Sequence, residues 1–395
     1  MKNDGPKLPQ KHEPTSLPKA KRLGSIAARW TLKAAYRGLQ PQAQEDFCQS
    51  PDSQRLRRIY STTDDGWQLP VYCLPVRDAQ HAEPVLLAPS WGQNHHSLQF
   101  QKQNSLAWHL QAAGYAVFLL SHRGVREAIS PGTRGSWDFD DIVQLDLPAI
   151  LDSVLERSDY SRVHWVGHGL GGQLLYGHLA NEGPERIACG STICAPVRFE
   201  SPPTRAKALG LALRLLPGEM QLPTRGFGKI ASPALSVDSP WMEQLGHRQT
   251  HGDMARGMLL HGTENLSSSL IQQVLTWTER GFLSDRHGHQ DVAAALEGER
   301  TPLQIIATDG DHLCPPEAAF AIEDFWDGPV DRLRLDAGWG HQDPILAPEA
   351  KSTVFPRVEK WLGQNRSCLH QHATEAEEVA SHHEREMSQP AHQLG

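Results

Sequence analysis

Residues 163–175 read VHWVGHGLGGQLL. The apolar run Val163–Val166 predicts a short buried strand, Gly167–Gly172 a tight turn, and Gln173–Leu179 the start of a helix. Glycines on both sides of a central residue allow such a turn to lift that residue above the edge of a sheet, at a helix N-terminus. The central residue here is Gly169, and we expect it to lie in a functional site.

A glycine-rich turn also fits a dinucleotide-binding loop loosely. In that fold the turn usually follows the first strand of its domain, whereas several predicted strands precede this one. Arg58–Tyr60 and Leu69–Leu74 flank an Asp-Asp-Gly turn and predict an antiparallel hairpin. Further short apolar runs predict strands at Val85–Ala88, Ala116–Ser121, Ile187–Cys194, Leu303–Ala307 and Arg332–Leu335.

Helix-length segments alternate with these strands. They are predicted at Leu98–Ala113, Ile142–Leu155, Ala318–Phe325 and Ala350–Leu362. This alternation is typical of a mostly parallel sheet covered by helices, so the predicted fold class is α/β.

The alternation of predicted strands and helices stops between Pro202 and about Arg300. Helical spacing of leucines at 209–216 and 270–277 is present there, but no strand is predicted. We expect an inserted helical cap at 201–300, which divides the core into 55–200 and 301–365. A basic arm at 1–54, partly disordered, and a disordered His- and Glu-rich tail at 366–395 are expected to flank the core.

Four motifs follow one another in a fixed order. They are VLLAPSWGQN at 85–94, the glycine turn at 167–172, ATDGDHLCPP at 307–316 and GWGHQD at 338–343. In this order they resemble the α/β-hydrolase superfamily, and within it bacterial lipase- and esterase-like members that carry a helical cap between strands six and seven. The resemblance covers about residues 55–365.

The resemblance implies a site. The triad of that family runs nucleophile, acid, histidine along the chain, and Gly169, Asp311 and His341 occupy these places. The implied oxyanion hole consists of the backbone N–H groups of Trp91 and Leu170. The remaining residues of the implied elbow are Gly167, His168 and Gly171. For His168 we favour a histidine hydrogen-bonded beneath the elbow.

Gly169 departs from the family pattern, because glycine has no hydroxyl and forms no acyl-enzyme. Three interpretations remain open. The sequence is a variant of a serine enzyme; or water attacks the ester, deprotonated by His341 with Asp311 orienting it; or the protein has lost catalysis and binds a ligand or acts as a scaffold. The favoured one is impaired ester hydrolysis by activated water. A lyase or oxygenase without cofactor is a more distant alternative.

Neighbouring residues do not settle this choice. Ser90 and Cys314 lie near the expected mouth of the site, but neither is on the elbow, so we favour neither as nucleophile. Cys314 reads as a small packed residue. A buried pair of Asp311 and His341 could also persist for stability alone, and Gly169 could serve only as a tight-turn glycine.

Composition limits the partners. The chain has 395 residues, of which 39% are hydrophobic, and a net charge of −8. It can bury a sizeable core, and its charge disfavours nucleic acid as a partner. Leucines in the expected cap favour a small apolar or acyl-ester-like ligand. Residues 24–40 could form a basic amphipathic helix on a membrane surface, but we favour its packing on the acidic remainder of the chain.

No cofactor or metal is expected. The chain has 21 histidines; of the pairs His95-His96, His247/His251 and His382-His383, only His247 and His251 stand four residues apart as in a zinc helix, and they lack the glutamate of that motif. Six widely spaced cysteines read as reduced thiols, and the start of the chain lacks the apolar segment of a secretory signal. The predicted location is cytoplasmic.

Overall fold

A computed structural model describes residues 46–49 and 55–369, except for 77, 79–80, 133–135, 201–212, 215–216, 218–219, 227–245, 247 and 251. The basic segment at 24–40, the histidines 247 and 251, and the tail from residue 370 onward lie outside the described residues. Among the described helices, none is long and apolar enough to cross a membrane.

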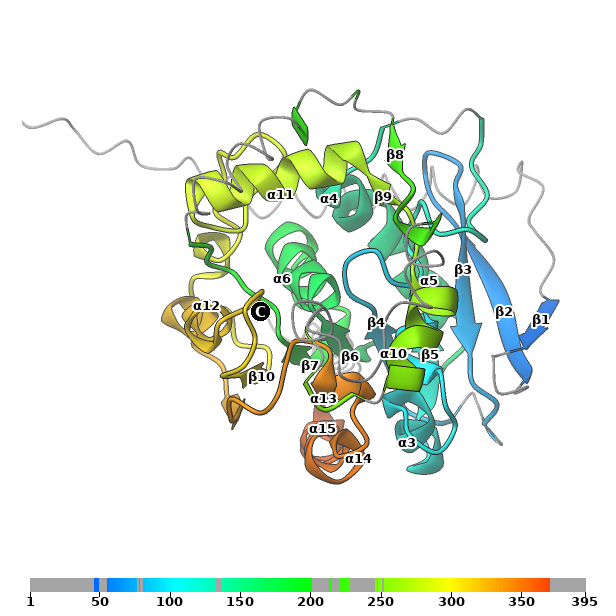
Figure 1. The fold of residues 1–395 in the computed structure, drawn as a ribbon. Helices are drawn as coiled ribbons and strands as arrows, with labels where there is room; N and C mark the ends of the chain where they lie inside the picture. Colours follow the sequence, from blue (N-terminus) through cyan, green and yellow to red (C-terminus); the bar gives the residue numbers. More distant parts are fainter. Residues whose placement is uncertain are drawn as a thin grey trace, which may run out of the picture. The chain divides into compact units, whose positions relative to one another are not determined.

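Nine strands of the described part form one sheet in the order β1-β2-β3-β5-β4-β6-β7-β10-β11 (Figure 1). Their bounds are Asp46–Gln49 (β1), Arg55–Thr62 (β2), Gln68–Cys73 (β3), Pro84–Ala88 (β4), Ala116–Leu119 (β5), Val163–His168 (β6), Ile187–Ile193 (β7), Leu303–Thr308 (β10) and Val330–Leu335 (β11). The strands from β5 to β11 pair in parallel, and the predicted hairpin β2–β3 is antiparallel. The predicted α/β class with a mostly parallel sheet is confirmed.

Helices cover both faces of this sheet. They are α2 (His96–Gln99), α3 (Leu106–Ala112), α4 (Phe139–Asp141), π-helical η1 (Ile142–Asp146), α5 (Leu147–Leu155), α6 (Leu170–Glu182), α12 (Pro316–Phe320), η5 (Ala321–Phe325), α13 (Asp343–Leu346), α14 (Ala350–Thr353), α15 (Phe355–Gln364) and η6 (Arg366–Leu369). α3 joins β4 to β5 and α6 joins β6 to β7, in opposite directions along the sheet. Because such crossovers are right-handed, α3 and α6 lie on opposite faces. α15 packs against α3, and α6 packs against η1.

The strand order reverses between β4 and β6. From β4 the chain turns to β5 on one side, and from β6 it turns to β7 on the other. The loops at the carboxyl ends of β4 and β6 therefore diverge and leave a crevice between them, which is where open α/β sheets bind ligands. The predicted elbow follows β6, so the topology places Gly169 at this crevice.

Several predicted helices are interrupted. The segment expected as one helix at Leu98–Ala113 forms α2 and α3, because the Ser105 side chain accepts the Trp108 N–H and starts a new helix. The segment expected at Ala350–Leu362 divides at Val354, where a proline in the first turn begins α15.

The insertion between β7 and β10 is described only in part. Its described elements are β8 (Gln221–Leu222), α10 (Gly252–Gly257), π-helical η3 (Met258–Gly262), β9 (Leu266–Ser267), α11 (Ser268–Arg280) and η4 (Ala294–Leu296). α11 lies where leucine spacing predicted a helix. The prediction that no strand occurs here is wrong, since β8 and β9 pair. The division into arm, core, cap and tail stays a prediction, although β1 of the expected arm pairs with β2.

Candidate active site

Gly169 has the positive φ that a tight turn with a central glycine predicts. Its φ is 51° and its ψ is −113°, between β6 and the first residue of α6. The flanking glycines permit close packing, because an ideal Cβ on Gly167 would lie 2.2 Å from the Gly171 carbonyl carbon, and one on Gly171 would lie 2.1 Å from the Ala88 oxygen. Any side chain at either flanking position would separate α6 from the strands. The sequence thus folds into a sharp turn that presents residue 169 to the crevice.

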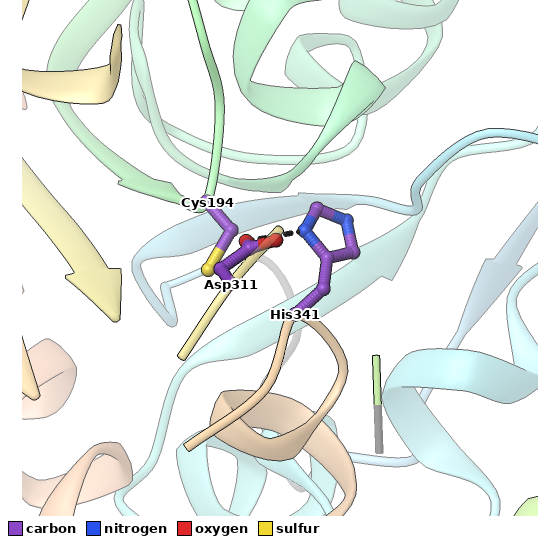
Figure 2. Close-up of side chains that lie close together, drawn as sticks. All are labelled: Cys194, Asp311 and His341. Atoms are coloured by element: carbon purple, nitrogen blue, oxygen red, sulfur yellow. Dashed lines mark hydrogen bonds and ion pairs between the residues drawn. The ribbon is translucent and has the colours of Figure 1, made fainter. Parts of the chain in front are cut away.

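Asp311 and His341 meet beside this turn. Asp311 follows β10 and His341 follows β11, and His341 Nδ1 lies 2.6 Å from Asp311 Oδ2 in a buried pair (Figure 2). The other carboxylate oxygen accepts the backbone N–H groups of Leu313 and Cys314 at 2.7 and 2.9 Å. Burial would raise the pKa of Asp311, but the hydrogen bond and charge of His341 and these N–H groups outweigh it, so that the pKa is lowered. Asp311 is therefore an ionised acceptor that orients the imidazole.

Cys194 is a third member of this cluster that the sequence analysis did not assign to the site. It directly follows β7, the parallel neighbour of β10, and has a positive φ of 50°. Its Sγ, a carboxylate oxygen of Asp311 and a ring nitrogen of His341 lie within 4.8 Å of one another (Figure 2). Its place at the carboxyl end of a predicted parallel strand was the available signal.

Thiolate, imidazole and carboxylate are also metal ligands. Here both oxygens of Asp311 already accept hydrogen bonds, from His341 Nδ1 and from two backbone amides. Burial, followed by the charge of Asp311, raises the pKa of the Cys194 thiol well above its usual value, which favours the protonated form over a metal-binding thiolate. The donor set fits an oriented histidine better than a metal centre.

The loop that carries His341 is held from two sides. From below the elbow, His168 Nε2 donates to the His341 carbonyl oxygen at 2.9 Å, and its ring is buried. From the insertion, the Gly246 carbonyl accepts the Gln342 N–H at 2.8 Å, and Asp343 accepts several backbone amides. His168 thus has the hydrogen-bonded place beneath the elbow that the sequence favours for it.

Trp91 and Leu170 are the residues whose backbone N–H groups the resemblance assigns to the oxyanion hole. Trp91 follows β4, and Leu170 is the first residue of α6, where amides have no partner within the helix. Neither N–H donates to another residue in the part of the chain that the structure describes. The Trp91 indole donates to Gln173 Oε1 at 3.1 Å and packs edge-on against Trp277. The oxyanion hole formed by these two amides stays a prediction.

A cavity of about 430 Å³ opens beside these groups. This volume lies within the range of roughly 300–1,000 Å³ that is usual for small-molecule sites. Its polar end is formed by Ser90, Gly169 and His341, and its walls are mostly apolar. The apolar lining includes Phe199, Leu266, Ile271, Val274, Leu275 and Trp277. Gly169, His341 and Trp91 thus line one apolar cavity, and Asp311 is hydrogen-bonded to His341 behind it, whereas Leu170 does not line the cavity.

Ser90 lies closer to the elbow than its place in the sequence indicates. An ideal Cβ built on Gly169 would lie 2.1 Å from Ser90 Oγ and 3.4 Å from His341 Nε2. Cys314 is the other residue that was expected near the mouth of the site. It is buried, and burial raises the pKa of its thiol well above the usual value. It contributes to the site through its backbone N–H on Asp311.

Known proteins share this architecture. Gastric triacylglycerol lipase of Bos taurus is 33% identical over 128 residues, which are 28% of this chain and 31% of that protein. The chain thus matches about a third of that relative's length. A solved structure of "DcsB complex with its substrate analogue" has a TM-score of 0.56 at 17% identity, covering 78% of this chain and 99% of the other. A monoacylglycerol lipase of Paleococcus ferrophilus has a TM-score of 0.53 at 16% identity, covering 75% and 99%.

These two structures are too distant in sequence to show more than the fold. The family pattern described as alpha/beta hydrolase fold, however, matches residues 83–348, which include the elbow, the acid loop and the histidine loop. The resemblance inferred from the four motifs is thereby confirmed, and the chain belongs to the α/β-hydrolase fold family.

Proposed function

We propose that the protein hydrolyses carboxylic esters that have an apolar acyl or alcohol part, with His341 as general base. The observation that carries the proposal is the hydrogen bond between His341 Nδ1 and Asp311, which leaves Nε2 as the nitrogen beside the elbow at the polar end of an apolar cavity. An imidazole in this place can accept a proton from a hydroxyl and return it to the leaving alcohol.

Residue 169 supplies no hydroxyl for this reaction. Water is the attacking group that the sequence predicts, and the amides of Trp91 and Leu170 would bind the negative charge that develops on the carbonyl oxygen. The name of the relative found by sequence, a triacylglycerol lipase, supports an ester as substrate. The apolar lining of the cavity supports an acyl chain over a sugar.

A binding protein without catalysis is the second candidate, and Gly169 is the observation that favours it. The same cavity would then hold an apolar ligand, with the pair of Asp311 and His341 retained for stability.

The test is hydrolysis of p-nitrophenyl esters of increasing acyl length by the purified chain. We expect His341→Ala to lower kcat by about 10²- to 10⁴-fold, the usual contribution of a general base. His81→Ala is the matched control, because His81 and Asp78 form a similar pair at 2.8 Å on an exposed loop, and this variant should keep full activity. Turnover no greater than that of His341→Ala, with thermal stabilisation by fatty acid preserved, would favour the binding protein.

A further inference from the structure

Ser90 Oγ occupies the space in which a side chain at residue 169 would begin. The 2.1 Å between this oxygen and the ideal Cβ position on Gly169 is far shorter than any non-bonded contact, so a side chain at residue 169 would force Ser90 Oγ to move. Ser90 reaches this point because it follows β4, which is the neighbour of β6 in the sheet. Two loops that are 79 positions apart in sequence thus converge on one point.

Gly169 and Ser90 complement each other in space. The elbow position that the resemblance assigns to a serine is Gly169 in this chain, and the loop after β4, which faces the elbow, carries Ser90. Glycine at the elbow removes the hydroxyl and opens space, and serine in the facing loop places a hydroxyl into that space. The site therefore retains one serine oxygen beside the histidine.

The surroundings of Ser90 suit a reactive hydroxyl. The residue is only 2% exposed, yet it lines the cavity together with His341. Its Oγ forms no hydrogen bond with any residue that the structure describes, so no structural partner competes for the proton. His341 Nε2 lies 3.4 Å from the same Cβ position, and rotation of Ser90 about χ1 changes the direction of its hydroxyl. Catalytic hydrogen bonds often tighten only when substrate binds.

We propose that Ser90 is the nucleophile of this site. The inference rests on the proposed ester hydrolysis and replaces water by Ser90 in its first step. Ser90 Oγ bonds to the carbonyl carbon of the ester, while its proton moves to His341 Nε2. The C–O bond to the alcohol then breaks, and the alcohol leaves with the proton from His341.

The acyl group is released in a second step. Water gives a proton to His341, attacks the acyl-Ser90 ester and displaces Ser90 Oγ, which takes the proton back. In this mechanism the backbone N–H groups of Trp91, which directly follows the nucleophile, and of Leu170, the first residue of α6, would serve as the two oxyanion-hole donors.

The experiment is to incubate the unmodified chain with a fluorophosphonate, locate the adduct by peptide mass spectrometry, and compare ester turnover in Ser90→Ala. We expect the adduct on Ser90 and a loss of at least 10³-fold in kcat. Ser61→Ala is the matched control, because Ser61 is a buried serine on β2 whose Oγ has no partner among the described residues. It should keep both labelling and turnover.

Three results separate this inference from the proposed function. An adduct on Ser90 supports the inference, and because it is measured on the unmodified chain it does not depend on how a variant folds. Turnover that depends on His341 but persists in Ser90→Ala within about tenfold, with Ser90 unlabelled, overturns the inference and returns the attack to water. Neither turnover nor adduct in the unmodified chain overturns the inference and the proposed function together.

Discussion

The carboxylate of Asp343 accepts both the backbone N–H and the hydroxyl of Thr250, at 2.9 and 2.6 Å. Its second oxygen accepts the backbone N–H groups of Arg248, Gln249 and Gly340, at 2.8, 3.0 and 2.7 Å. Asp343 is fully buried. One carboxylate thus fastens the loop that carries His341 to a segment of the insertion.

Asp343→Asn should therefore be strongly destabilising. An amide nitrogen would face amide hydrogens that now have an acceptor, and buried donors that lose a charged partner cost about 2–4 kcal/mol in total. Asp309→Asn is the control, because the pair of Asp309 and Arg334 is largely exposed and should contribute less than about 1 kcal/mol. Urea denaturation measures both. Similar losses in the two variants would contradict the fastening role of Asp343.

The lowered pKa of Asp311 predicts that the stability of the folded chain depends on pH. Its pKa is lowered in the folded chain, because hydrogen bonds from His341 and two backbone amides outweigh burial. A group of this kind contributes stability above its unfolded pKa near 4 and loses the contribution as the pH falls through the lower folded value. Asp311→Asn should therefore lower the melting temperature at pH 7, with a gap from the wild type that narrows below about pH 4. A gap that stays constant down to pH 3 would show that Asp311 is not ionised in the folded chain.

The cluster of Arg286 with three aspartates at α4 should give the opposite dependence of stability on pH. Its guanidinium lies 3.2 Å from Asp138, 3.3 Å from Asp140 and 2.8 Å from Asp141. Burial and then the charge of Asp141 raise the pKa of Asp138 to about 6, while Arg286 opposes this rise. The folded chain thus holds a proton that the unfolded chain releases above 3.8, so the contribution of Asp138 to stability falls as the pH rises towards 6.

Arg286→Ala should make this trend steeper, because the three carboxylates lose the cation that they share. We expect a larger loss of unfolding free energy at pH 8 than at pH 4.5, measured by urea denaturation at both values. Arg332→Ala, which removes an exposed pair with Glu323, is the control and should show little difference between the two pH values. An equal loss for Arg286→Ala at both values would mean that Asp138 does not titrate in this range.

α11 supplies a wall of the cavity, so its side chains should set acyl length. Val274 and Leu275 line the cavity, while Arg280 of the same helix is exposed. Val274→Trp should lower kcat/KM for decanoate esters by about tenfold or more and leave acetate esters nearly unchanged, because a bulkier wall excludes long chains first. Arg280→Trp should alter neither. A uniform loss for all esters in Val274→Trp would place the acyl chain elsewhere.

The sequence predicted the parts of the site that depend on local pattern. Short apolar runs marked the strands, and the resemblance to the α/β-hydrolase family singled out Asp311 and His341, which the structure places in the loops after β10 and β11. The glycines of the elbow predicted a tight turn from the sequence alone. The structure shows why they are needed, because a Cβ on Gly167 or Gly171 would collide with the backbone around α6. Helix interruptions at Ser105 and Val354 were missed, because a single cap or an early proline overrides an amphipathic period.

The sequence pattern did not predict contacts between loops that are far apart in the chain. Ser90 is not on the elbow, so its sequence position did not favour it as nucleophile; yet the sheet order makes β4 and β6 neighbours and brings Ser90 Oγ to the position of a side chain at residue 169. Cys194 and Asp343 were missed in the same way, since each acts on a residue of another loop. Parallel pairing decides which loops meet, and that order follows from tertiary packing.

Gly169→Ser tests how much of the site is assembled. The new Cβ would collide with Ser90 Oγ, and its distance of 3.1 Å from Ser90 Cβ would be tight even after the hydroxyl turned away. A side chain at a φ of 51° also costs about 1–3 kcal/mol. We expect the single variant to be less stable than the wild type and to gain little fluorophosphonate labelling at residue 169.

Ser90→Gly should relieve the collision, because it removes both the hydroxyl and the Cβ that face residue 169. The double variant Gly169→Ser with Ser90→Gly should therefore be labelled at residue 169 and hydrolyse p-nitrophenyl esters in a manner that depends on His341. Ser90→Gly alone is the control and should show neither. If the double variant folds, as judged by its melting temperature, but remains unlabelled, then the amides of Trp91 and Leu170 do not form a working oxyanion hole, because the hydroxyl and its base would both be in place.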